Sequence, residues 1–123
     1  MTAIVLAGHG SRAQEANAAL GVLAHTLAND LGVRAYPAYL EMTEPAIPDA
    51  LRRARADGAD RIVVVPYFLS PGMHVRRDLV GIVDAARVEL GIPIELADFL
   101  GAHPDVPRLL GDLARATLAV KAS

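Results

Sequence analysis

The sequence predicts a three-layer α/β domain, a sandwich in which a four-stranded parallel sheet lies between helices on both faces. Strand-like aliphatic segments alternate four times with segments whose apolar residues recur at helical spacing. Successive β-α units of this kind form parallel sheets with right-handed crossovers. The 123 residues, 53% of them hydrophobic, can build one core, so we expect a single domain over residues 1–123.

The first β-α unit is predicted from an aliphatic strand, Ala3 to Ala7, and a long helix after it. Ser11 and Gln14 match a capping box, which predicts that the helix begins there. Gly32 provides a left-handed end. The helix itself is predicted by apolar residues at helical spacing: Ala16, Leu20, Leu23, Leu27 and Leu31.

The second unit has a strand from Arg34 to Leu40 and a short helix that ends near Gly58. Thr43, Glu44 and Pro45 combine a cap, a first-turn acid and an early proline, which predicts the helix start. One face of this helix is predicted to be apolar, with Ile47, Leu51 and Ala54. The other face is predicted to lie in solvent, with Arg52, Arg53 and Arg55.

The third strand, Ile62 to Val65, is apolar without alternation, which indicates a central strand covered on both faces. A helix from about Val75 to Leu90 follows it. The fourth strand is predicted from Ile94 to Phe99, and a last helix begins near Pro104 and runs to the end of the chain. That helix has this apolar stripe: Val106, Leu109, Leu110, Leu113 and Leu118.

Two histidines follow strands at matching places in the chain. His9 follows the first strand and His74 follows the third. The expected strand order, 2-1-3-4, puts strands 1 and 3 side by side with their following loops diverging, which makes a topological switch point. Ligands of open α/β sheets bind at such points, so the topology predicts a site where the two histidines meet.

These residue types indicate metal chemistry. The chain has no cysteine, so nitrogen and oxygen must hold any metal. Neutral imidazole binds borderline divalent ions and accepts protons near neutral pH. Glu41 ends the second strand at the same edge, as a third ligand or a proton relay. Arg12, Arg76 and Arg77 lie just beyond the histidines, where they could hold the carboxylates of a substrate.

Other polar residues have structural interpretations. We expect His25 in solvent, His103 at the entry to the last helix, and Glu44 stabilising a helix dipole. The turn from Gly8 to Arg12 lacks the spacing of a nucleophile elbow and the Lys-Ser/Thr pair of a Walker A loop. Phosphate binding at this helix start is a third interpretation.

Composition limits the class of partner. The net charge is −2 and the basic residues are scattered, which argues against nucleic acid. No apolar run is long enough to cross a bilayer, and no charged leader precedes the first strand. We therefore expect a cytoplasmic protein that acts on a small molecule.

Together the motifs resemble the short sirohydrochlorin cobaltochelatase family of the CbiX type, small class II chelatases related to the siroheme ferrochelatase SirB. The resemblance covers essentially the whole chain. It rests on four segments: Val5 to Arg12; Leu40 and Glu41 with Pro45; Val65 to His74 with Asp78 and Leu79; and Leu100 to Pro104.

The resemblance implies insertion of a divalent metal into sirohydrochlorin with release of two protons, in cobalamin or siroheme synthesis. Co²⁺ is the metal ion that the resemblance favours, and Fe²⁺ and Ni²⁺ are the alternatives. No organic cofactor is implied. In the family, histidines matching His9 and His74 bind the metal and take up pyrrole protons, and Glu41 matches a glutamate of many relatives. Thr43 lies where some relatives touch substrate, and one loop would cradle the macrocycle: Leu69, Ser70, Pro71, Gly72 and Met73.

A homodimer is also implied, because short members of the family usually pair. The competing interpretation is a carrier that binds metal or tetrapyrrole without catalysis. A carrier would not exceed the rate of uncatalysed metallation.

Overall fold

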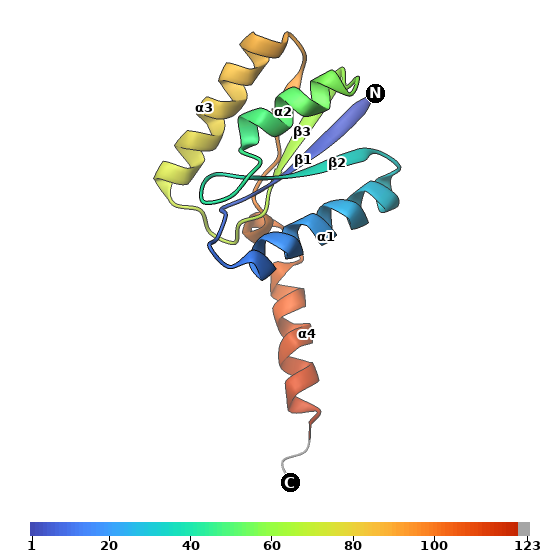
Figure 1. The fold of residues 1–123 in the computed structure, drawn as a ribbon. Helices are drawn as coiled ribbons and strands as arrows, with labels where there is room; N and C mark the ends of the chain where they lie inside the picture. The colour runs from blue at the N-terminus through green and yellow to red at the C-terminus, as the bar shows by residue number, and fades with distance from the viewer. Residues whose placement is uncertain (121–123) are drawn as a thin grey trace.

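A computed structural model describes residues 1–120, and these form one parallel sheet in the order β2-β1-β3-β4, as predicted (Figure 1). Adjacent strands pair in register along β1, which lies between β2 and β3. The elements are β1 Thr2–Gly8, α1 Gln14–Leu31, β2 Arg34–Tyr39, α2 Ile47–Ala56, β3 Arg61–Pro66, α3 Met73–Leu90, β4 Ile94–Leu96, the 3₁₀ helix η1 Leu100–Ala102 and α4 Val106–Leu118.

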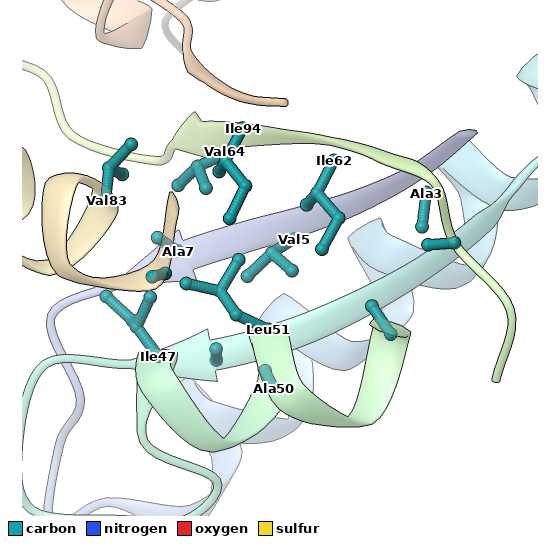
Figure 2. Packing of buried hydrophobic residues seen from close by; sticks show 14 of the residues in the cluster. Ala3, Val5, Ala7, Ile47, Ala50, Leu51, Ile62, Val64, Val83 and Ile94 are labelled. Carbon is teal, nitrogen blue, oxygen red and sulfur yellow. The ribbon is translucent and has the colours of Figure 1, made fainter. Parts of the chain in front are cut away.

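Helices lie on both faces of the sheet. α2 and α3 pack together on one face, and α1 packs against β1 and β2 on the other (Figure 1). The main core lies under α2 and α3, where Val5, Leu51 and Ile62 are fully buried (Figure 2). A smaller cluster under α1 contains Leu6 and Leu20. Burial of these aliphatic side chains drives formation of the sheet and fixes its carboxyl edge.

The capping box predicted at Ser11 and Gln14 is wrong, because a tertiary contact replaces it. Helix α1 begins at Gln14 with Ala13 as its N-cap. The buried side chain of Asn17 instead brackets the backbone of Ser11, accepting from its N–H at 3.0 Å and donating to its carbonyl at 2.8 Å. The Ser11 hydroxyl accepts from the Ala13 N–H at 3.0 Å. These bonds hold the turn that follows β1.

Helix α2 begins at Ile47, later than the predicted cap at Thr43 and Pro45. Tyr39 donates its backbone N–H to the Pro45 carbonyl and forms a bridge with Ala46, so this segment extends the sheet rather than the helix. Glu44 therefore lies before the helix and not in its first turn, and Pro48 occupies the early proline position. The predicted apolar and arginine faces of the helix are confirmed.

The last β-α unit departs most from the prediction. Strand β4 ends at Leu96 rather than Phe99, and α4 begins at Val106. None of the α4 residues is buried, and the helix projects away from the sheet (Figure 1). The predicted stripe of α1 is partly exposed as well, at Ala16, Leu23 and Leu31. The predicted continuation of the last helix beyond residue 120 lies outside the described residues.

Within residues 1–120, no helix combines the length and apolar character that a membrane span requires.

Candidate functional site

His9 lies directly after β1, between groups from both neighbouring strands. Its Nε2 is 2.9 Å from Oε1 of Glu41, which follows β2. Its ring meets the ring of Phe68, which follows β3, edge-on with centroids 6.4 Å apart. The side chains of His9 and Glu41 are 55% and 54% exposed, so a large ligand can reach them from solvent.

Backbone geometry holds the two loops together. Glu41 donates its N–H to the His9 carbonyl at 3.1 Å, which continues the β1-β2 pairing beyond the strands. Gly10 has a φ of 96°, and a Cβ at this position would lie 1.8 Å from the Glu41 carbonyl oxygen. Only glycine permits this approach. Met42, next to Glu41, turns the chain with a φ of 68°.

His74 is the second residue of α3, one position inside the helix rather than before it as predicted. It is exposed, and within residues 1–120 it makes no hydrogen bond or ion pair with His9 or Glu41. Across that same part of the chain, no three His, Asp or Glu side chains converge on a metal position. The structure thus joins His9 to Glu41 and leaves joint ligation by both histidines as a prediction.

A cleft of about 540 Å³ opens from His9 and Glu41 and continues between α2 and α3. At its far end Arg52 and Glu89 form a two-pronged ion pair, with N–O distances of 2.7 and 2.9 Å. Asp78 also lines the cleft. Sequence reasoning assigned no role to Asp78, although its spacing of four residues from His74 puts both on one helix face.

The loop between β3 and α3 is held by the segment after β4. Gly101 donates its N–H to the Phe68 carbonyl at 3.1 Å, and a Cβ at Gly101 would lie 1.5 Å from the Leu69 carbonyl oxygen. Arg76 donates from Nε to the Pro71 carbonyl at 3.3 Å, and its guanidinium carbon lies 4.5 Å from the centre of the Phe99 ring. The loop is therefore shaped from two sides.

Apolar side chains are exposed on the loops around His9. Each follows a strand or begins a helix at the carboxyl edge of the sheet: Met42 (59% exposed), Tyr67 (47%), Leu69 (69%) and Met73 (73%). Exposed apolar surface near a polar pair is typical of a binding site. Of the other loop residues predicted to bind substrate, Ser70 and Gly72 are exposed and Pro71 is half-buried.

Arginines without ion-pair partners flank this edge. Among residues 1–120, seven arginines form ion pairs with carboxylates, and Arg55 bonds to a backbone carbonyl instead. The three at this edge, Arg12, Arg76 and Arg77, form no ion pair in that part of the chain. All three are exposed, so their charges are available to an anionic ligand. Thr43 is half-buried, and its N–H bonds to the Glu41 carbonyl at 2.9 Å, which makes it part of the turn that carries Glu41.

The remaining histidines lie as the sequence predicts. His25 is exposed on α1, with its Nε2 3.3 Å from Nδ2 of Asn29. His103 accepts the backbone N–H of Asp105 at Nδ1, 3.0 Å away, and so shapes the entry to α4.

Comparison with known proteins identifies relatives along most of the chain. The sequence model of the CbiX family matches residues 3–117. The chain is 36% identical over 102 residues to the chloroplastic sirohydrochlorin ferrochelatase of Arabidopsis thaliana, covering 81% of this chain and 45% of that protein. It is 41% identical over 80 residues to the sirohydrochlorin cobaltochelatase of Methanocaldococcus jannaschii, covering 64% and 56%. The chain thus spans about half the length of these curated relatives.

Solved structures share the fold. A cobalamin biosynthesis CbiX protein from Marinobacter aquaeolei VT8 superposes with a TM-score of 0.85 at 29% identity, covering 96% of this chain and 98% of that one. The sirohydrochlorin chelatase SirB from Bacillus subtilis, in complex with cobalt, gives a TM-score of 0.82 at 23% identity over 94% of this chain and 50% of its own. The SirB likeness concerns the fold alone.

Proposed function

This chain belongs to the CbiX family, and from that membership we propose that it is a sirohydrochlorin chelatase that inserts a divalent metal ion into the macrocycle. Co²⁺ is the first candidate, with Fe²⁺ and Ni²⁺ as alternatives, because imidazole and carboxylate ligands do not separate these ions by type. The observation that carries the proposal is the contact between His9 and Glu41 at the exposed carboxyl edge of the sheet. The metal and the tetrapyrrole are both substrates.

The reaction exchanges one divalent ion for two protons on ring nitrogens. His9 accepts one pyrrole proton while the adjacent Glu41 carboxylate stabilises the resulting imidazolium, and the second pyrrole proton passes to solvent at the exposed edge. Since Nε2 of His9 faces Glu41, Nδ1 is the nitrogen left for the metal or the ring proton. We assign His74 as the second metal ligand, reached when substrate and metal occupy the edge. Few, exchangeable ligands suit an ion that must be released into the ring.

The loops supply the binding surface. Leu69 and Met73 present apolar area to the flat face of the macrocycle, and Thr43, Ser70, Pro71 and Gly72 complete the cradle. Sirohydrochlorin carries acetate and propionate groups, which the guanidinium groups of Arg12 and Arg76 bind, since neither forms an ion pair among the described residues. The proposal includes a cytoplasmic location, a homodimer, and a place in cobalamin or siroheme synthesis.

Anaerobic absorbance with sirohydrochlorin in excess over protein tests this function. Co²⁺, Fe²⁺ and Ni²⁺ are added in turn, and the initial rate is compared with a protein-free sample. A chelatase metallates many equivalents of sirohydrochlorin per chain and faster than the protein-free sample. A rate no higher than that sample, with sirohydrochlorin bound, would instead identify a non-catalytic carrier.

A further inference from the structure

Met42 turns the chain directly after Glu41 in a conformation that few residues with side chains adopt. Its φ is 68°, and Thr43 donates its N–H to the Glu41 carbonyl at 2.9 Å. A positive φ beneath a bond between residues i and i+2 is the geometry of the classic γ-turn, which is rare and strained. Within residues 1–120, Met42 is the one residue other than glycine with a positive φ. The strained backbone of this part of the chain therefore lies beside Glu41.

The turn holds the backbone of Glu41 where its side chain meets His9. The Glu41 N–H donates to the His9 carbonyl at 3.1 Å. The Glu41 carbonyl oxygen, which accepts from Thr43, lies so close to Gly10 that a Cβ there would be 1.8 Å away. None of these contacts involves the side chain of Met42, and glycine would adopt the same φ without steric cost. The turn explains the backbone at residue 42 but not the methionine.

The Met42 side chain contributes little to the fold. It is 59% exposed, and it is not among the side chains that pack against either core cluster of the described residues. Its apolar surface in water and its strained backbone are both unfavourable in the free chain. Strained residues that persist in this way cluster at active sites and ligand clamps. The combination indicates that the side chain serves a ligand rather than the fold.

Strand order puts Met42 across His9 from the other exposed apolar residues of this edge. Because β1 lies between β2 and β3, His9 lies between the loops that follow these two strands (Figure 1). Met42 belongs to the loop after β2, whereas Leu69 and Met73, 69% and 73% exposed, come after β3. Two strand spacings, about 10 Å, separate β2 from β3. Four linked pyrrole rings are wide enough to bridge this distance.

We propose that Met42 is a substrate-binding residue whose side chain packs on the macrocycle of sirohydrochlorin, on the flank of His9 opposite Leu69 and Met73. This assignment rests on the proposed chelatase function and deepens it, because it gives the macrocycle apolar contacts on both sides of the proton-accepting histidine. An unbranched, flexible thioether side chain adapts well to the surface of a ring. Met42 holds no metal and takes up no proton, so its loss weakens substrate binding and leaves kcat unchanged.

Titration of sirohydrochlorin fluorescence without added metal tests the assignment apart from metallation. Met42→Gln keeps the length of the side chain and removes its apolar surface, so we expect the dissociation constant to rise roughly tenfold, the loss of most of one apolar contact. Met42→Leu should bind nearly as wild type, because it restores an apolar side chain of similar volume.

Val88→Gln is the matched control, since Val88 is 86% exposed and lies about 22 Å along α3 from Met73, and it should bind as wild type. If the wild type binds sirohydrochlorin and Met42→Gln binds it equally well, the assignment alone is wrong. A wild type that binds no sirohydrochlorin would overturn the proposed function and this assignment together.

Met42→Gly provides the second test, because it removes the side chain and the backbone strain at once. We expect it to bind sirohydrochlorin as weakly as Met42→Gln while its Tm stays at or above that of wild type. Thermal melts measure the second effect. A clear fall in Tm would show that the side chain stabilises the fold, which contradicts the proposal. A fall in kcat at saturating sirohydrochlorin, with the dissociation constant unchanged, would contradict it as well.

Discussion

The Glu41 carboxylate fixes how His9 presents its ring. With Oε1 2.9 Å from Nε2, Glu41 orients the imidazole and leaves Nδ1 without a partner among the described ion pairs. A carboxylate behind a ligating or proton-accepting histidine holds the ring in one orientation and one tautomer. The proposed chelatase therefore depends on a pair of residues rather than on His9 alone.

Glu41→Gln should lower kcat for metallation by roughly 10- to 100-fold, as other losses of a carboxylate behind a histidine do. The amide keeps the shape of the side chain but cannot stabilise an imidazolium. Glu44→Gln is the matched control, because Glu44 is exposed, belongs to the same loop and has no partner among the described ion pairs. Initial rates measured by absorbance give kcat for both variants. Equal kcat values would show that Glu41 takes no part in the mechanism.

At the residue scale, sequence reasoning predicted that His9 and His74 meet and placed Glu41 at the same edge of the sheet, whereas the contact in the structure joins His9 to Glu41. Strand order alone places the ends of β1 and β2 together, so this contact could be foreseen. Asp78 could not be assigned, because its place in the cleft depends on how α2 packs against α3. The edge-on contact of Phe68 with His9 likewise depends on a loop conformation that no local pattern specifies.

At the element scale, the segment after β4 shapes the loop proposed to cradle the macrocycle. Gly101→Ala would drive a Cβ into the Leu69 carbonyl, so one of the two backbones must move. We expect KM for sirohydrochlorin to rise roughly tenfold, about 1.4 kcal/mol, with overpacking that lowers stability by about 1–3 kcal/mol. Gly21→Ala is the control, since a Cβ there meets nothing within 4 Å. Steady-state kinetics measure the change in KM, and thermal melts measure the change in stability. An unchanged KM with lowered stability would show that Gly101 has only a structural role.

A second contact between elements gives a pH-dependent prediction. The Tyr36 hydroxyl of β2 donates to Asp57 Oδ2, at the end of α2, at 2.7 Å. This bond is the main cause that holds the pKa of Asp57 below its usual value. A carboxyl whose pKa is lower in the folded state contributes stability above its unfolded pKa of about 3.9, and this contribution is lost as pH falls through the lower folded pKa.

Tyr36→Phe should therefore lower Tm at pH 7, and the difference from wild type should narrow below pH of about 4 as Asp57 is protonated in both proteins. Calorimetric melts across this pH range measure the effect. Tyr39→Phe provides a comparison, because the Tyr39 hydroxyl donates to the Asn17 backbone carbonyl and not to a carboxylate. If the Tm difference between Tyr36→Phe and wild type stays constant with pH, the ionisation of Asp57 is not its cause.

The sequence predicted which segments form helices and which form strands, but it predicted the first and last residues of these elements less well. Helical apolar spacing found all four long helices, but tertiary bonds override the local signals at their starts. Asn17 takes the place of the capping box at α1, and pairing of Tyr39 with Ala46 delays α2. These contacts join residues that lie apart in the sequence. Local sequence patterns do not include such contacts, so the predicted helix caps were wrong.

At the scale of the whole molecule, alternation of β-α units limits the possible topologies enough to predict the strand order, which the structure confirms. The place of α4 could not be predicted in this way. Its stripe of leucines indicates burial, yet within this chain the stripe stays exposed.

We propose that sirohydrochlorin is metallated at the carboxyl edge of this sheet, by its histidines. The most direct test is the anaerobic multiple-turnover rate with Co²⁺ for wild type, His9→Ala, His74→Ala and His25→Ala. His25 is an exposed histidine on α1 and serves as the matched control. We expect each site variant to lose roughly 10²- to 10⁴-fold in rate, the usual contribution of a positioned acid or base, with its Tm retained, and the control to keep full activity. Full activity in His9→Ala or His74→Ala would contradict the assignment of that histidine, and full activity in both would place the chemistry elsewhere.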